Sequence, residues 1–360
     1  MFHTTSMRKW ILPAVTLIPL IFAALTIYVH RDQLFDGTWA IAKSSPKIIN
    51  VKSFGARGNG KTDDANAVYR AVNAAAASHG TVYFSKGTYL LSFPIEIPRY
   101  VSISGAGMTQ TTFKTTNPNT NDIFSLRGNQ TIKQVGFVGK IGIWPMGDHI
   151  TIDSVKFQTS VQSIQMASTV RYFTVTHSLF TGSGYSILSN QHPSYNVTIS
   201  HSKFLNNHSD DIEINAPSRW WTIDSNTFSG ITSNTPNAGF GVGVAVGAKN
   251  IVIKNSSFNN IAGQAVHAED GSQVSIVNCK FQNNGFIHYP GSPEADIAVL
   301  SRANVSVSNS SFYKSNKWYS KLAIFNTDWP VGGKLSVSSS RFYSKYIYQP
   351  ALLKKSRFYK

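Results

Sequence analysis

The sequence predicts an all-β fold: a parallel β-solenoid with an N-terminal capping helix, preceded by one transmembrane helix. Three observations predict it. A short segment of alternating apolar and polar residues, which we call the recurring phrase, occurs eight times between residues 150 and 342. An alanine-rich amphipathic stretch precedes these repeats, and an uncharged apolar stretch lies near the N-terminus. Repeats of roughly 20–50 residues stack so that each buries the apolar face of its neighbour.

The apolar stretch is residues 10–29, WILPAVTLIPLIFAALTIYV. About 20 helical residues span the hydrocarbon core of a bilayer. Because Arg8 and Lys9 precede it, the positive-inside rule places residues 1–9 in the cytoplasm and the membrane-anchored body in the periplasm or outside the cell. The alternative is a cleaved signal peptide, although the small-x-small site at residues 40–42 lies far beyond the apolar stretch. Residues 30–48 are expected to form a short tether.

Residues 49–98 predict a cap for the open end of the solenoid. Thr62-Asp63-Asp64 offers a helix N-cap, the helix runs to Ser78, and the strand TVYF and a turn at Gly87 follow. An uncovered coil exposes both apolar core and a strand edge, so the helix is well placed to cover it.

The coils occupy residues 99–349 and a short basic tail occupies residues 350–360. Each of the eight phrases ends in phenylalanine, and the inward-facing positions lie seven and five residues earlier. The spacings between successive phenylalanines are 23, 24, 24, 30, 23, 31 and 30 residues, and the eight are Phe157, Phe180, Phe204, Phe228, Phe258, Phe281, Phe312 and Phe342.

A polar residue stands three positions before each phenylalanine, which suits a tight turn. His177 and His201 occupy this position, so we interpret them as members of a turn ladder rather than as ligands. Cys279 falls one position later among serines and is interpreted as a small packed residue. As the only cysteine, it also excludes a disulfide framework or a cysteine-rich metal module.

The run from Val51 to Ser92, with FGARGNGKTDD, the helix and GTVYFSKGTYLL, resembles the N-terminal cap of the pectate lyase superfamily of right-handed parallel β-helices. Bacteriophage tailspikes and polygalacturonase-type hydrolases share this cap. The resemblance implies carbohydrate processing, commonly of acidic polysaccharides. The fold alone does not identify the reaction, because it hosts lyases, hydrolases, epimerases and binding scaffolds.

The composition agrees with an acidic partner. The chain of 360 residues carries 33 Lys and Arg against 17 Asp and Glu, a net charge of +16, and 42% hydrophobic residues exclude disorder for most of it. A positive surface suits an anionic glycan, a membrane surface or nucleic acid. A basic bias without function explains the charge equally well. Nucleic acid is not expected, because the basic residues are scattered and the body is exported.

A second strand in each coil predicts the candidate site. Its inward residues are Ile164, Ile187, Ile212, Val266 and Ile297. The alternation predicts that the neighbours on both sides face outward, which gathers acids and one histidine on a strip. These outward neighbours are Ser163, Ser186, Asp211, Ala265, Asp296, Gln165, Leu188, Glu213, His267 and Ala298, with Asp210 and Glu269 close by.

Two lengthened coils flank this strip. One brings Gly239, Gly241 and Gly243 opposite the carboxylates, and the other contains Glu294. Insertions on one edge of a solenoid commonly wall its binding surface, and the glycines leave room for a sugar ring. Packing of bulky neighbours is an equal explanation for the glycines.

The strip suits either of two chemistries. Glycoside hydrolysis needs two carboxyl groups, which Asp211 and Glu213 supply. Asp210-Asp211 and His267 resemble the paired aspartates and the histidine of polygalacturonases, but the Asn-Thr-Asp, Gly-His-Gly and Arg-Ile-Lys motifs are missing. A lyase or epimerase needs a base, such as His267, and a group that neutralises the uronate.

The neutralising group could be Arg219, Arg302 or a Ca²⁺ ion held by the carboxylates. Trp220 faces out beside Arg219 and can stack on a sugar, whereas Trp318, Tyr319 and Trp329 cap the far end.

The sequence therefore points to an enzyme that cleaves or modifies an acidic polysaccharide, with Asp210, Asp211, Glu213, His267 and Glu269 as catalytic candidates. Arg219, Trp220, Asp296 and Arg302 are the candidates for substrate binding. The alternatives are a solvated surface without a role and a non-catalytic glycan-binding or structural scaffold. The fold is compatible with a monomer or a homotrimer.

Overall fold

The computed structural model describes residues 47–116, 122–233, 238–287, 292–314, 321–326, 334–348 and 352–359. The predicted transmembrane segment, residues 10–29, lies outside the described residues, as do Trp318, Tyr319 and Trp329. Within the described ranges, no helix has the length and apolar character needed to cross a membrane.

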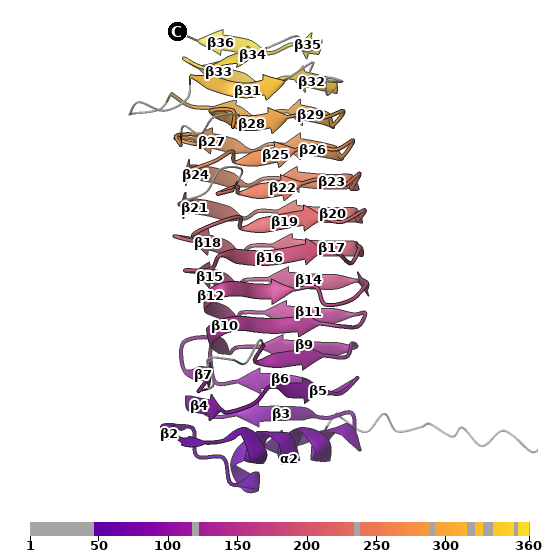
Figure 1. Ribbon diagram of the computed structural model, residues 1–360, viewed down its shortest axis with the longest axis vertical. Coiled ribbons are helices and arrows are strands. Elements are labelled where there is room, and N and C mark those ends of the chain that lie inside the picture. The colour runs from indigo at the N-terminus through magenta and orange to yellow at the C-terminus, as the bar shows by residue number, and fades with distance from the viewer. Residues whose placement is uncertain are drawn as a thin grey trace, which may run out of the picture. The chain divides into compact units, whose positions relative to one another are not determined.

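The described residues from 47 onward form coils of parallel strands stacked along one axis (Figure 1). Each complete coil contributes one strand to each of three rows, which we call sheets A, B and C. Neighbouring strands in a row come from successive coils, so residues at the same phase of the repeat pair side by side. The predicted parallel solenoid is confirmed.

Sheet A contains the apolar strands of the recurring phrase. Its strands are β1 (Ile48–Asn50), β3 (Thr81–Phe84), β6 (Ser102–Gly105), β9 (Gln130–Lys133), β11 (Ile150–Asp153), β14 (Phe173–Thr176), β17 (Ser194–Ser200), β20 (Arg219–Asp224), β23 (Lys249–Lys254), β26 (Gln273–Val277), β29 (Asn304–Ser308), β32 (Lys334–Ser338) and β35 (Leu352–Lys354), with β13 (Val170–Arg171) beside β17.

Sheet B contains the phenylalanine strands. They are β2 (Asn59–Asp63), β4 (Gly87–Leu91), β7 (Thr111–Thr115), β10 (Gly136–Pro145), β12 (Lys156–Gln165), β15 (Leu179–Thr181), β18 (Lys203–Leu205), β21 (Thr227–Ile231), β24 (Ser257–Ile261), β27 (Lys280–Gln282), β30 (Ser311–Phe312), β33 (Arg341–Tyr343) and β36 (Arg357–Tyr359).

Sheet C contains the second strand that the sequence predicted. The long strands β10 and β12 continue from sheet B into it. The others are β5 (Ile95–Ile97), β8 (Phe124–Leu126), β16 (Tyr185–Asn190), β19 (Ile212–Asn215), β22 (Val242–Val244), β25 (Val266–Ala268), β28 (Ala295–Val299), β31 (Leu322–Asn326) and β34 (Tyr346–Tyr348).

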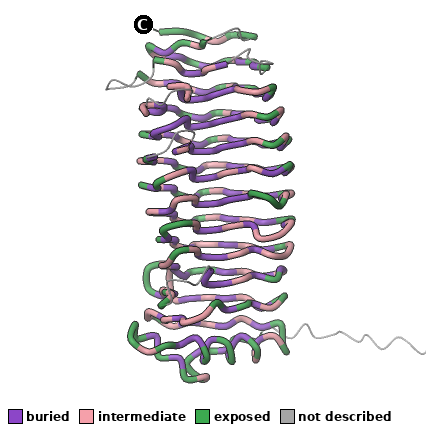
Figure 2. Tube along the Cα trace, in the orientation of Figure 1, coloured by how far each residue is buried: buried purple, intermediate pink, exposed green. Residues whose placement is uncertain are grey.

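Ladders of like side chains fill the interior. The phenylalanines of sheet B pair in register from Phe137 to Phe342, and successive rings from Phe157 to Phe342 stack with centroids 4.6–5.2 Å apart. Each buried phenylalanine contributes about 2 kcal/mol relative to an exposed one. Figure 2 shows the resulting pattern, with exposed residues gathered at the turns, the cap and the last coil.

The turn ladder is confirmed. All eight residues three positions before the phenylalanines have left-handed φ angles of 49–57°, and the rings of His177 and His201 stack with centroids 5.4 Å apart. Cys279 is buried, and burial raises the pKa of its thiol to about 12, which agrees with a packed, unreactive residue.

The cap is also as predicted. Helix α2 (Ala65–Ala76) follows the short helix η1 (Val51–Phe54), and the side chain of Asp63 accepts the backbone N–H of Ala65. Its apolar face, Val68 and Val72 included, is buried against the first strands, and it ends two residues before Ser78.

One boundary differs from the prediction. Residues 350–360 were predicted as a basic tail, but β35 and β36 pair with β32 and β33 and extend the solenoid. Leu352, Leu353 and Phe358 on these two strands are exposed.

Candidate active site

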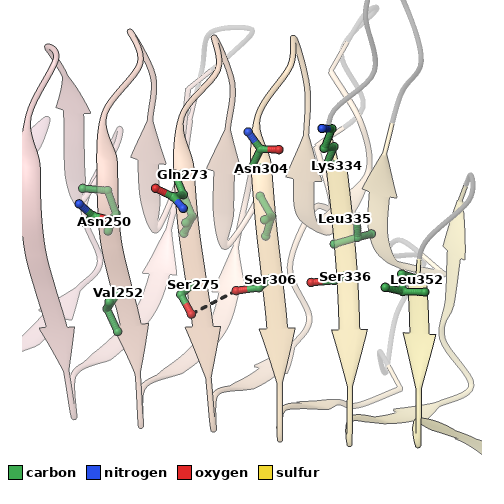
Figure 3. A pocket seen from close by; sticks show the side chains of 13 residues that line it. Asn250, Val252, Gln273, Ser275, Asn304, Ser306, Lys334, Leu335, Ser336 and Leu352 are labelled. Atoms are coloured by element: carbon green, nitrogen blue, oxygen red, sulfur yellow. Dashed lines mark hydrogen bonds between the residues drawn. The ribbon is translucent and has the colours of Figure 1, made fainter.

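Two hollows are candidates for a functional site. The larger, about 620 Å³, lies on the outer face of sheet A towards its C-terminal end (Figure 3). Its outward side chains are mostly amides and hydroxyls, with Lys334 as the only charged group that lines it. Among the described residues that line it there is therefore no carboxyl or imidazole group for proton transfer.

The smaller hollow, about 220 Å³, lies on the outer face of sheet C and contains most of the predicted catalytic residues. It is formed by β19, β22, β25 and the residues that precede and follow them. The residues that line it are Tyr185, Asp210, Glu213, Ile214, Asn215, Phe240, Gly243, Val244, Ala245, His267 and Glu269.

The strand register brings Glu213 and His267 to this pocket. Ile212 and Ile214 point into the core, so Glu213 between them faces out, and Glu213, Gly243 and His267 pair across three successive coils. Gly243 supplies no side chain between the other two. A Cβ atom there would lie 3.4 Å from the Phe240 ring and 3.9 Å from Glu213 Cγ, so the missing side chain creates the hollow.

Gly239 and Gly241 have a different role. A Cβ on Gly241 would lie 2.6 Å from the carbonyl oxygen of Ala265, and Gly239 has a φ of 84°. Both glycines are required by packing and backbone conformation. Of the two explanations that the sequence left open, close packing applies to Gly239 and Gly241, whereas Gly243 leaves open space beside Glu213.

His267 is held on three sides. Its ring stacks on Phe240 with centroids 4.3 Å apart, its Nδ1 lies 2.9 Å from Gln264 Oε1, and its Nε2 lies 3.4 Å from Glu269 Oε2. The amide of Gln264 donates to the carbonyl of Pro293, so its oxygen is presented to His267 and Nδ1 carries hydrogen. Nε2 therefore faces the Glu269 carboxylate.

The surroundings move the pKa values of the carboxyl groups in opposite directions. Burial raises the pKa of Asp210 to about 7, although the N–H of Phe240 donates to it at 2.7 Å. Burial also raises the pKa of Glu213, and the charge of Glu269 adds to this effect. The hydrogen bond from His267 lowers the pKa of Glu269. Two carboxyl groups whose pKa values differ in this way can act as acid and base in one site.

The prediction that Asp211 and Asp296 face outward is wrong. Both carboxyl groups are fully buried, as are Ser163, Ser186 and Ala265 at the same phase. Asp211 directly precedes β19, and Asp296 is the second residue of β28, so both lie close to the corner between sheets B and C, where the strand alternation does not yet apply.

Each of these two aspartates has interior partners. Asp211 accepts hydrogen bonds from Asn207 at 2.5 Å and Ser186 at 3.0 Å, and burial raises its pKa well above the usual range. Asp296 accepts a hydrogen bond from Asn284 at 3.0 Å and lies 3.1 Å from Lys345 Nζ. Neither aspartate lines the pocket.

The remaining substrate-binding candidates lie away from the pocket. Arg219 and Trp220 begin β20, beyond the corner that follows Asn215, and Trp220 is exposed as predicted while Trp221 is buried. Arg302 lies in the turn after β28 and does not line the pocket.

Sequence reasoning missed three residues of the site. Tyr185 lines the pocket from the preceding coil, and burial raises the pKa of its phenol. Phe240 and Gln264 come from irregular segments, whose side-chain directions the repeat does not specify. The lengthened coils do flank the site, as predicted, through Phe240 and Pro293.

Metal binding has no structural support within the described ranges. There, no group of three or more His, Cys, Asp or Glu side chains is arranged to hold a metal ion.

Comparisons with known proteins agree with the fold. The model of the family described as "Rhamnogalacturonase A/epimerase, pectate lyase-like" matches residues 48–286, about two thirds of the chain. Alginate lyase 7 of Azotobacter vinelandii is 47% identical over 73 residues, which cover 18% of this chain and 8% of that protein. The chain spans less than a tenth of the length of the first curated relatives it matches.

Two solved structures show the same fold. The A-module of mannuronan C-5 epimerase AlgE6 from Azotobacter vinelandii has a TM-score of 0.60 and 15% identity, covering 87% of this chain and 99% of that one. The catalytic unit of the GH87 α-1,3-glucanase from Streptomyces thermodiastaticus has a TM-score of 0.62 and 14% identity, covering 86% and 69%.

Proposed function

The chain belongs to the rhamnogalacturonase A/epimerase, pectate lyase-like family of right-handed parallel β-helices, and from this premise we propose that it is an enzyme that hydrolyses glycosidic bonds in a polysaccharide. One observation carries the proposal: a single pocket holds carboxyl groups whose pKa values move in opposite directions around His267.

Hydrolysis requires a proton for the leaving oxygen and a carboxylate that activates water or stabilises the sugar cation. Glu213, whose pKa is raised, is the proton donor. Glu269, which His267 keeps ionised, is the base. Their strands lie two coils apart, about 10 Å by the spacing of strands in a sheet, and the gap above Gly243 between them accommodates the scissile bond.

Asp210 and Gln264 position these groups. Asp210 accepts the N–H of Phe240, whose ring stacks on His267, and Gln264 fixes which nitrogen of His267 faces Glu269. Rigid support of this kind lowers the cost of organising charges during the reaction.

Elimination and epimerisation are less well supported. Both reactions begin with loss of a proton next to a uronate carboxylate, whose charge must be neutralised. The described residues that line the pocket include three carboxyl groups and no Lys or Arg, so no cation among them stabilises the charge that develops on this carboxylate when the proton leaves.

The proposal extends to the polymer and the location. The polymer is acidic and the body is held outside the cytoplasm by residues 10–29. The net charge of +16 supports the first statement, and the uncharged stretch of 20 residues behind Arg8 and Lys9 supports the second. The names of the relatives, which include an alginate lyase and mannuronan epimerases, agree with an acidic polymer.

The test uses the full chain in non-ionic detergent with alginate, polygalacturonate, rhamnogalacturonan and 1,3-glucans. Reducing ends and the ultraviolet absorbance of unsaturated uronates are followed together. We expect reducing ends to increase without absorbance, and Glu213→Gln and Glu269→Gln to abolish the increase. Glu96→Gln, which removes an exposed partner of Arg127 in the cap region, is the matched control and retains activity.

Two outcomes contradict the proposal. Absorbance that increases with reducing ends identifies a lyase. No cleavage, with polymer still bound by the wild type and by both pocket variants, identifies a binding scaffold.

A further inference from the structure

A strip of exposed rings and cations follows the corner between sheets C and A. We define the aromatic–cationic strip as His149, Tyr172, Tyr195, Trp220, Arg171, Arg219 and Lys249. Its residues lie on four successive coils, immediately before or at the start of β11, β14, β17 and β20, and on β23 of the next coil. None of them lines the candidate active site.

The backbone at this corner makes the rings unusual. His149, Tyr172, Asn196, Trp220 and Asn250 occupy one phase of the repeat and all have left-handed φ angles of 56–60°. Asparagine tolerates this conformation better than other side chains, and bulky residues adopt it at a cost in strain. The rings at this phase are therefore disfavoured locally.

Burial of these rings does little to offset the cost of their backbone conformation. Tyr172 and Trp220 are 51% and 52% exposed. His149 stacks on Tyr172 with centroids 4.6 Å apart, and the Tyr195 and Trp220 ring centroids are 6.3 Å apart. Half of the surface of Tyr172 and of Trp220 thus remains open to solvent, a feature that packing of the core does not explain.

Cations run alongside the rings. Arg171, Tyr195, Arg219 and Lys249 pair in register across four coils, and the Arg171 guanidinium lies 5.6 Å from the centre of the Tyr195 ring. Asp148 lies 3.6 Å from Arg171. Within the described part of the chain, Arg219 and Lys249 form no ion pair, so their charges remain available to a ligand.

We propose that the aromatic–cationic strip is a second binding site, separate from the pocket, for a linear anionic polysaccharide. The C–H face of a sugar ring packs on an aromatic ring, and guanidinium and ammonium groups bind carboxylates or sulfates. The strip is a narrow line along the axis, repeated at each coil by about 4.8 Å, and this shape fits an extended polymer. The polymer's identity rests on the proposed function.

The strip lies close enough to the pocket to share one polymer. Asn215 lines the pocket, and Arg219 of the strip follows it by four residues. The backbone positions of these two residues are therefore at most about 14 Å apart. A polymer held on the strip raises the effective concentration of its own bonds at the pocket. The strip therefore lowers KM for long chains and leaves turnover of short oligosaccharides unchanged.

The test replaces the two most exposed rings with asparagine. Because Asn196 and Asn250 already occupy this phase with the same backbone, Tyr172→Asn/Trp220→Asn retains the fold. Retention of the full chain in gels containing alginate is expected to weaken about tenfold in this variant, whereas neutral dextran retains neither protein. Arg219→Gln/Lys249→Gln is expected to weaken alginate binding and to reduce its salt dependence. Tyr346→Asn, an equally exposed ring on β34, is the control.

The outcomes separate this inference from the proposed function. If both double variants retain alginate as well as the wild type does, the proposed binding role of the strip is wrong, whether or not the pocket cleaves polysaccharide. Weakened retention in a protein that cleaves nothing supports the strip and leaves hydrolysis without support. If the protein binds phosphatidylglycerol vesicles through the strip and does not bind alginate, the ligand of the strip is a membrane surface and the proposed polymer is wrong.

Discussion

The two candidate hollows differ in size and in chemistry. The hollow over sheet A has a volume of about 620 Å³ and the pocket over sheet C about 220 Å³. The larger one lies over sheet A strands that pair in unbroken register, so similar small polar side chains recur, as in the hydrogen-bonded Ser275 and Ser306. The smaller one lies where a lengthened coil brings Phe240 and Gly243 between Glu213 and His267. The chemistry of the lining residues, rather than volume, distinguishes the candidate active site.

Loss of the base is the strongest test of this contrast. Glu269→Gln removes the carboxylate that His267 holds ionised, and we expect kcat on the best substrate to fall about a thousandfold. Ser306→Ala in the sheet-A hollow is the partner experiment and leaves kcat unchanged. Steady-state kinetics measures both, and equal losses in the two variants would contradict the assignment of function to sheet C.

Filling the pocket is the second test. Gly243→Val introduces a side chain into a gap that has ordinary contact distances around it, so the fold is retained. We expect activity to fall about a hundredfold, because substrate no longer reaches its position between Glu213 and Glu269. Circular dichroism checks the fold. Gly241→Val is the contrasting variant: its Cβ collides with the Ala265 carbonyl, and we expect it to lower the melting temperature. Full activity in Gly243→Val contradicts the proposed substrate position.

Removing the support of His267 has a smaller effect. Gln264→Leu deletes the acceptor at Nδ1, and we expect kcat to fall about tenfold because the ring is no longer fixed towards Glu269. Gln264→Glu retains an acceptor oxygen and recovers most of the loss. A purely structural role predicts equal damage from both variants together with a lower melting temperature.

Much of this structure was predictable from the sequence, for a physical reason. Stacking coils require the same residue type at the same phase, so the phenylalanine ladder, the turn at His177 and the outward direction of Glu213 follow from counting. Counting residues from the phenylalanines does not predict side-chain directions at the corners and in the insertions. Asp211 sits one residue before its strand and turns inward, and Phe240 comes from a segment that no other coil repeats. The carboxylates of the site were predictable, whereas the groups that tune them were not.

The smallest predicted effect concerns pH. Activity requires ionised Glu269 and protonated Glu213. Activity therefore rises as the pH passes the lowered pKa of Glu269 and falls as it passes the raised pKa of Glu213. The expected pH–activity profile is bell-shaped, with its maximum between the two pKa values. The amide of Asn215 donates to Glu213 at 3.1 Å and favours its charged form. Asn215→Ala removes this bond, so the pKa of Glu213 rises and the alkaline limb of kcat moves to higher pH by less than about one unit. The acid limb, which belongs to Glu269, stays in place. A shift of the acid limb alone contradicts this assignment and makes Glu213 the base.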